Sequence, residues 1–180
     1  LQTVKKDGAM SNKSQICLVD DGSKDNTWQL IASQTEDPLL CGLKLSRNFG
    51  HQPAVTAGLN YASGDVVAVM DADLQDPPEV LPELFSEWEN GHQVVYAVRR
   101  KRREPWYKKI AYFFYYRLLK TVAEINIPLD SGDFCAMDRV VVDNLNRLPE
   151  KNRFIRGIRA WVGFRQTGVQ YERHSRFSGS

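Results

Sequence analysis

The sequence predicts an α/β fold in which a mostly parallel sheet is flanked by helices. Three observations predict it: apolar, strand-like segments alternate with helix-like segments over residues 15–100, each apolar segment is continuous, and polar side chains follow its end. Continuous apolar segments are typical of strands that other elements cover on both faces. With 180 residues, 42% of them hydrophobic and 26% charged, the chain is long enough for one domain with its own core.

Four strands and three helices are expected in order over this region. The strands are expected at residues 15–21, 39–46, 65–73 and 92–100, and the helices at residues 24–36, 52–63 and 78–91. A Ser23/Asp25 capping signal precedes the first helix, and Pro53 stands near the start of the second. Acidic residues occupy the first turn of the third helix. This order predicts a doubly wound, mostly parallel sheet.

Beyond residue 100 the pattern changes. Residues 104–124 are basic and aromatic and predict a helix, residues 131–148 predict a turn followed by a helix, and residues 153–176 predict a helix or turn followed by a strand. The apolar stripe of the first of these helices fits an amphipathic helix lying on lipid headgroups, and it fits equally well a helix packed on the sheet. Its longest apolar run, Ile110 to Leu119, contains Arg117 and is too short to span a bilayer.

Charge divides the chain into two parts. Residues 1–98 contain 6 Lys/Arg and 14 Asp/Glu, a balance of −8, whereas residues 99–180 contain 18 and 8, a balance of +10. The two parts are therefore expected to perform different tasks. Three widely spaced cysteines, Cys17, Cys41 and Cys135, match neither a disulfide framework nor a metal site, and they favour a reducing, cytoplasmic compartment.

Polar side chains stand at the ends of the four expected strands. In an open parallel sheet the ligand crevice lies beyond the carboxyl ends of the strands, so these residues are expected to converge on one edge. They are Asp20 and Asp21 in the first strand, Ser46, Arg47 and Asn48 after the second, Asp71 and Asp73 in the third, and Arg99 and Arg100 in the fourth.

The Asp-Ala-Asp unit carries the sharpest prediction. Side chains alternate faces along a strand, so Asp71 and Asp73 are expected to point the same way. Two carboxylates so close repel one another unless a cation lies between them, and oxygen ligands suit Mg²⁺ or Mn²⁺ shared with substrate phosphates. Gln75 would add a neutral oxygen if the chain stays extended. The alternative is a polar turn after a buried strand.

The other strand ends admit both functional and structural interpretations. Asp20 is a candidate acceptor for a nucleotide base or a ribose hydroxyl, although Asp, Gly and Ser also suit a strand-to-helix turn, in which Ser23 and Asp25 are helix caps. Arg99 begins a run of five basic residues, which is a candidate phosphate contact or a solvated loop. Nucleic acid is not the expected partner, because the nearby aromatic residues form a helical stripe rather than a spaced stacking platform.

Three stretches together resemble the inverting family 2 glycosyltransferases of GT-A fold. They are Val19–Thr27 (VDDGSKDNT), Leu45–Glu79 (LSRNFGHQPAVTAGLNYASGDVVAVMDADLQDPPE) and Ser131–Arg139 (SGDFCAMDR). The subgroup that they resemble most is the polyprenyl-phosphate sugar transferases, of the dolichol-phosphate mannosyltransferase and bactoprenol-phosphate glucosyltransferase type. The resemblance runs from about Ile16 to Gly179, and DADLQDPPE with RNFG upstream is a specific signal.

The resemblance implies a metal-dependent transfer of a hexose from a UDP- or GDP-linked sugar to a polyprenyl phosphate, at the cytoplasmic face of a membrane. It implies a divalent cation, Mg²⁺ or Mn²⁺, held by Asp71 and Asp73 with Gln75, and nucleotide contacts from Asp20 and Asp21. It leaves self-association into a homo-oligomer open.

On the acceptor side the resemblance matches Asp133 to a candidate base or positioning carboxylate, and the alternative for Asp133 is a helix N-cap. It places the acceptor phosphate among basic residues of the second part of the chain. These are Arg139, Arg156, Arg173 and Arg176. A lipid phosphate is already largely anionic at neutral pH, so such an acceptor needs arginines more than it needs a base.

The resemblance also predicts one GT-A catalytic domain over residues 1–180, with a donor- and metal-binding part at 1–98 and a basic, acceptor-binding part at 99–180. Members of the family open with a strand that ends in Pro-x-Tyr-Asn-Glu, and many continue into transmembrane helices. This sequence contains neither feature, so base recognition and membrane anchoring are expected to be incomplete in it.

Other functions fit the motifs in different degrees. A family 2 enzyme that acts on a polysaccharide or another hydroxyl acceptor would share every motif above. A phosphorylatable signal-receiver domain also ends its first strand in an acid pair, but it does not account for DADLQDPPE, and its Lys-Pro pair is absent. A dinucleotide-dependent oxidoreductase would need a Gly-x-Gly-x-x-Gly turn, which the sequence lacks.

Overall fold

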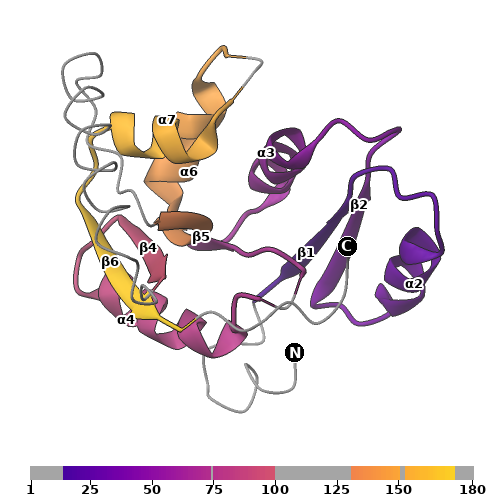
Figure 1. The fold of residues 1–180 in the computed structure, drawn as a ribbon, viewed down its shortest axis with the longest axis horizontal. Helices are drawn as coiled ribbons and strands as arrows, with labels where there is room; N and C mark the ends of the chain where they lie inside the picture. The colour runs from indigo at the N-terminus through magenta and orange to yellow at the C-terminus, as the bar shows by residue number, and fades with distance from the viewer. Residues whose placement is uncertain (1–13, 74, 100–130, 151–152, 173–180) are drawn as a thin grey trace, which may run out of the picture.

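The computed structural model describes residues 14–73, 75–99, 131–150 and 153–172 (Figure 1). Their elements in chain order are β1 (Ile16–Asp20), α2 (Thr27–Gln34), β2 (Leu40–Lys44), α3 (His51–Tyr61), β3 (Val66–Val69), the 3-10 helix η1 (Pro78–Val80), α4 (Leu81–Glu89), β4 (Val94–Arg99), β5 (Ser131–Asp138), α6 (Arg139–Arg147), α7 (Ile155–Trp161) and β6 (Gln166–Tyr171). The predictions for the helix at 104–124 and for Arg100, Arg173 and Arg176 fall outside the described residues.

The four strands and three helices expected before residue 101 are confirmed. The strands are shorter than expected by one to four residues at their ends, and α3 begins one residue earlier, at His51. The N-cap residue of α2 is Asn26 rather than Ser23 or Asp25, although Asp25 Oδ1 accepts the N–H of Thr27, the first residue of the helix, at 3.0 Å. Ser23 does not share that task; it donates its own N–H to Asp20 Oδ1 at 3.1 Å.

The strands form two sheets rather than one. β1 and β2 pair in parallel, and a separate sheet has the order β3-β5-β4-β6. β5 is antiparallel to both β3 and β4, and β6 is parallel to β4. Strands β3, β4 and β6 therefore share one direction, as the prediction of a mostly parallel sheet requires, while β5 runs against them in the middle.

The turn expected at the start of residues 131–148 was wrong, since Ser131–Asp138 is the strand β5. It hydrogen-bonds to neighbours on both edges and is buried on both faces, so it shows no alternation of polar and apolar residues. Phe134 packs in the core cluster beside α4, whereas Cys135 and Met137 pack in the cluster formed with α6 and α7. Residues 131–138 form a strand because segments distant in the sequence bury them, although their local sequence pattern predicts a turn.

Helices cover both faces of the four-stranded sheet. Figure 1 shows α4 on one side of it and α6 and α7 on the other, with α3 beside β1. Among the described residues every buried apolar side chain lies at or beyond Leu59. The β1–β2 pair and α2 therefore add little to the core. Over the described residues, the helices are all too short or too polar to cross a bilayer.

Candidate active site

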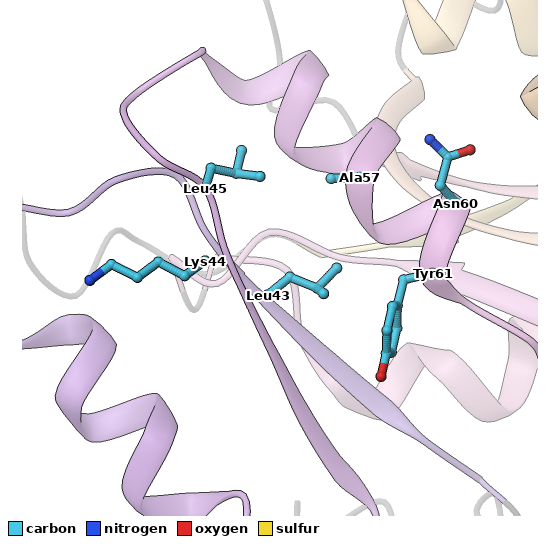
Figure 2. Close-up of a pocket in the computed structure, with 6 residues that line it drawn as sticks. All are labelled: Leu43, Lys44, Leu45, Ala57, Asn60 and Tyr61. Carbon is cyan, nitrogen blue, oxygen red and sulfur yellow. The ribbon is translucent and has the colours of Figure 1, made fainter.

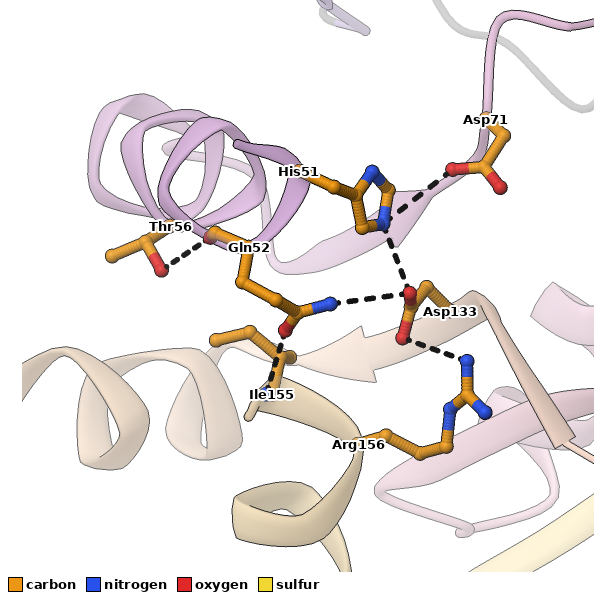
Figure 3. A network of polar contacts seen from close by, with 7 residues as sticks. All are labelled: His51, Gln52, Thr56, Asp71, Asp133, Ile155 and Arg156. Carbon is orange, nitrogen blue, oxygen red and sulfur yellow. Dashed lines mark hydrogen bonds and ion pairs between the residues drawn. The ribbon is translucent and has the colours of Figure 1, made fainter. Parts of the chain in front are cut away.

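Asp133, in β5, lies beside one of the predicted acceptor residues, Arg156. Its side chain is only 10% exposed. Its Oδ2 lies 2.9 Å from His51 Nε2 and accepts the amide N–H of Gln52 at 3.3 Å, both from the start of α3. Its Oδ1 lies 3.5 Å from Nη2 of Arg156 in α7. Figure 3 shows these side chains converging on the carboxylate. The N-cap alternative for Asp133 was wrong, because the cap of α6 is Asp138, whose Oδ1 accepts the N–H of Val140.

Asp71 and Asp133 both face the same ring nitrogen of His51, Nε2 (Figure 3). The Oδ1 of Asp71 is 3.8 Å from His51 Nε2. Burial raises the pKa of the Asp71 carboxyl; His51 opposes that shift, and the negative charges of Asp76, Asp133 and Asp73 add to it. One imidazole thus bridges the predicted donor-side and acceptor-side carboxylates, which are 62 positions apart in the sequence.

The alternation argument for Asp71 and Asp73 was wrong. β3 ends at Val69, and Ala72 and Asp73 lie in a turn. Asp73 Oδ1 accepts the backbone N–H of Gln75 at 3.0 Å, which closes a local loop of the kind that short acidic side chains favour. The two aspartates still influence one another electrostatically. The metal contacts predicted for Asp71, Asp73 and Gln75 stay predictions.

Asp20 and Asp21 at the end of β1 have different environments. Asp20 is 2% exposed; its Oδ1 accepts the N–H of Ser23, and its buried Oδ2 has no hydrogen-bond partner among the described residues. Asp21 accepts the N–H groups of Phe49 and Gly50 at 2.8 and 2.9 Å, one on each oxygen. Asp21 therefore holds the loop that leads into α3, while Asp20 has one buried oxygen without a partner among the described residues. Nucleotide contacts for both stay predictions.

Arg99 ends β4 beside a buried polar pair. Its Nε donates to the hydroxyl of Tyr171 at 3.4 Å, and that hydroxyl donates to Asp76. Asp76 is 2% exposed. The negative charges of Asp76 and Asp71 both favour the protonated form of Arg99, so Arg99 lies near these two carboxylates. Its contact with a phosphate stays a prediction.

The structure does not bring Arg139 to Asp133. Arg139 follows the far end of β5, about six residues or roughly 20 Å along the strand from Asp133. Its Nε and Nη2 donate to Gly64 O at 2.9 and 2.7 Å, and its Nη1 lies 3.4 Å from Asp143. Arg156 is the predicted acceptor arginine that the described residues place next to Asp133.

Sequence reasoning missed His51, Gln52 and Arg159. His51 and Gln52 follow the string RNFG at the first turn of α3, and asking which side chains open a helix after a strand end would have found them. Arg159 is 1% exposed in α7, with its guanidinium 5.7 Å from the ring of Tyr96 and its Nε without a hydrogen bond among the described residues. Nothing in the local pattern distinguishes this buried arginine from its exposed neighbours.

A shallow depression lies away from this cluster. Leu43, Lys44 and Leu45 line it on one side and Ala57, Asn60 and Tyr61 on the other (Figure 2). None of the predicted site residues contributes to it. The chemistry-bearing side chains gather instead at the starts of α3 and α7 and at the loop after β3.

Comparison with known proteins identifies a family. The family model described as Glycosyl transferase family 2 matches residues 2–145. The uncharacterized glycosyltransferase YkcC of Bacillus subtilis (strain 168) is 48% identical over 167 residues, which are 92% of this chain and 52% of that protein. The bactoprenol glucosyl transferase of Shigella phage SfV is 42% identical over 167 residues, 92% of this chain and 54% of that protein. The chain spans about half the length of the curated relatives that it matches.

Two solved structures confirm the predicted GT-A fold. The mannosyltransferase PcManGT from Pyrobaculum calidifontis, in complex with GDP-Man and Mn²⁺, matches with a TM-score of 0.60 at 20% identity, over 87% of this chain and 45% of that chain. S. aureus TarS 1–349 matches with a TM-score of 0.58 at 17% identity, over 88% of this chain and 50% of that chain.

Proposed function

The chain belongs to glycosyl transferase family 2, and we propose that it forms the catalytic part of an inverting glycosyltransferase that moves a hexose from a nucleotide sugar to a polyprenyl phosphate. The observation that carries this proposal is the 42% identity with a bactoprenol glucosyl transferase over 92% of the chain. The name of that relative favours glucose as the sugar. Because the acceptor is a membrane lipid, the reaction takes place at a membrane surface, on the cytoplasmic side.

Asp71 and Asp73, with Gln75, are the residues that would hold Mg²⁺ or Mn²⁺. The described residues contain no group of three or more His, Cys, Asp or Glu that could hold a metal ion. Two carboxylates still fit, because Mg²⁺ commonly takes one or two from the protein and its other ligands from water and substrate phosphates. The raised pKa of Asp71, caused by burial and by acidic neighbours, supports the fit. A bound cation would neutralise charge on the leaving diphosphate.

Asp20 is the proposed contact to the donor's nucleoside. Its buried Oδ2 has no hydrogen-bond partner among the described residues. A buried carboxylate oxygen without a hydrogen bond lowers the stability of the folded protein by about 1–3 kcal/mol or more, unless a donor reaches it. A base N–H or a ribose hydroxyl would supply that donor. Asp21 does not face the nucleoside in this proposal; it holds the backbone of residues 49–50 through two hydrogen bonds.

Arg156 and Asp133 form the proposed acceptor side. Nη2 of Arg156 in α7 lies 3.5 Å from Oδ1 of Asp133, so the cation and the carboxylate are neighbours. The guanidinium of Arg156 is partly exposed, with 32% of its side chain accessible, and is suited to binding an anion. The acceptor's phosphate oxygen attacks the anomeric carbon, the bond from that carbon to the diphosphate breaks, and its electron pair leaves with the diphosphate. No proton has to move in this step.

The test offers a radiolabelled UDP- or GDP-hexose and Mn²⁺ to the full-length protein, with undecaprenyl phosphate in one reaction and oligosaccharides in another. We expect label in the lipid fraction, and loss of that label with EDTA. Label that appears only in the oligosaccharides would replace the proposal with the hydroxyl-acceptor alternative.

A further inference from the structure

Gln52 joins three parts of the candidate site. It is the second residue of α3, and Figure 3 shows its amide between Asp133 and Ile155. The amide nitrogen donates to Asp133 Oδ2 at 3.3 Å, and the amide oxygen accepts the backbone N–H of Ile155 at 2.9 Å. The same side chain therefore touches the carboxylate in β5 and the first residue of α7, which lie 81 and 103 positions away in the chain.

The bond to Ile155 takes the place of a helix cap. The first N–H groups of any helix lack partners within it. Phe154, the N-cap residue of α7, has an apolar side chain that forms no capping bond. Gln52 supplies an acceptor from another helix for the N–H of Ile155, the first residue of α7.

Arg156 is the next residue of α7. Its Nη2 lies 3.5 Å from Oδ1 of the carboxylate whose Oδ2 receives Gln52. The side chain of Arg156 is 32% exposed, while its Nε is buried without a hydrogen bond among the described residues. Asp133 thus holds the guanidinium through Nη2, and the exposed part of the side chain can still donate to a phosphate, the kind of anion that guanidinium groups bind well.

We propose that Gln52 is a positioning residue for acceptor recognition: by holding Asp133 and the first N–H of α7 together, it aims Arg156 at the phosphate of the lipid acceptor. This role rests on the proposed function and adds to it a division of tasks: Arg156 contacts the phosphate, and Gln52 orients Arg156. A purely structural cap would stabilise α7 without affecting one substrate more than the other.

Gln52→Glu separates these roles. Glutamate keeps an oxygen that accepts the N–H of Ile155, but it replaces the donor facing Asp133 with a second acceptor, and two carboxylates at that distance repel. Thr56→Val is the matched control one turn further along α3, because Thr56 Oγ1 donates to the backbone oxygen of Gln52 at 2.9 Å and no contact of it reaches Asp133. Both variants are made in the full-length protein.

Steady-state kinetics with undecaprenyl phosphate, and isothermal titration with a short-chain polyprenyl phosphate, are the measurements. We expect Gln52→Glu to raise the acceptor KM and the acceptor Kd by about tenfold or more. The KM of the nucleotide sugar should stay within about twofold of the wild-type value. Thr56→Val should behave like the wild type in both measurements. Unchanged acceptor binding, or an equal rise in both KM values, would overturn the positioning role. Wild-type protein that binds the lipid phosphate without transferring sugar to it would reject the proposed function and leave the binding comparison valid. Wild-type protein that does not bind it would reject both.

Discussion

The carboxylate of Asp71 is partly buried, with 32% of its side chain exposed, beside Asp76, Asp133 and Asp73. Burial and these like charges raise its pKa, although His51 opposes the shift. Carrying a charge here costs free energy in the metal-free protein, and a bound cation would offset that cost. Groups selected for ligand binding are often unfavourable for folding in this way.

Asp71→Asn is therefore expected to leave the metal-free protein at least as stable, with a gain of up to about 1 kcal/mol, and to reduce sugar transfer by at least about 100-fold. Thermal unfolding in EDTA and the transfer assay are the two measurements. Glu79→Gln, which removes the same charge from an exposed residue, is the control and should change neither. Full activity of Asp71→Asn would remove it from the proposed metal site.

Cys17 gives a pH dependence with a definite sign. Burial, followed by the hydrogen bond and charge interaction with Cys41 in the paired strand, raises the pKa of Cys17 from 9.0 to about 12. The folded protein thus holds this proton more tightly than the unfolded chain does. The resulting stabilisation is present below pH 9 and is lost as the pH rises from 9 to about 12.

We expect the free energy of unfolding of the wild type to fall more steeply between pH 9 and pH 11 than that of Cys17→Ala. Urea unfolding of both proteins at several pH values gives the two free energies of unfolding. Subtracting one from the other removes the contribution of the lysines and tyrosines that both proteins share. Parallel curves for the two proteins would mean that Cys17 titrates alike in the folded and unfolded states.

The turn after β1 depends on a glycine for two separate reasons. Gly22 has φ +68, and a Cβ on it would lie 2.3 Å from the backbone carbon of Arg47 and 2.5 Å from the nitrogen of Asn48. Gly91, which follows α4, has φ +91, but a Cβ there would meet nothing within 4 Å. Substituting Gly91 would therefore cost only the free energy of the left-handed backbone, whereas substituting Gly22 would add the free energy of steric overlap.

Gly22→Ala is expected to destabilise the protein by at least about 3 kcal/mol, because it combines backbone strain with a collision that only movement of the loop at 47–48 can relieve. Gly91→Ala should cost only about 1–2 kcal/mol. Chemical denaturation of both variants gives the comparison. Equal losses would show that the loop moves aside at no cost.

The positions of the first strands and helices could be predicted because their signals are local. Continuous apolar runs marked β1 to β4, and Asp25 marked the start of α2. β5 could not be predicted, since its residues are buried by neighbours on both edges and both faces. The end of β3 was also missed: the chain leaves the strand at Val69, and the turn at 72–73 rather than strand alternation sets how the two aspartates lie.

The candidate site was predictable in its residue types and less so in its contacts. Position at or after a strand end made Asp20 and Asp71 candidates, and the resemblance made Asp133 and Arg156 candidates. Gln52 was missed because its role exists only through partners 81 and 103 residues away. Such long-range contacts depend on sheet order, which no local pattern specifies.

Buried apolar side chains are distributed unevenly over the molecule. Among the described residues they begin at Leu59, and α2 has none. Regions with few buried contacts open at a lower free-energy cost than the rest of a domain. The β1–β2 pair with α2 should therefore be the least stable part of the described structure, although it carries Asp20.

Hydrogen exchange followed by mass spectrometry tests this expectation. Amides of residues 16–44 should exchange at least about tenfold faster than those of β4 and β5, and a nucleoside diphosphate with Mn²⁺ should slow exchange near Asp20. Uniform protection across the two regions would show that the sheets unfold as a single unit.

The middle place of β5 also has a consequence for protein synthesis. β3 and β4 have no hydrogen bonds to one another, and each is joined to the other only through a strand that the ribosome makes more than thirty residues after β4. Until that strand emerges, a nascent chain presents two strand edges with unpaired backbone N–H and C=O groups, and it lacks Asp133. The growing polypeptide should accordingly engage chaperones at this stage and gain the ability to bind an acceptor late in translation.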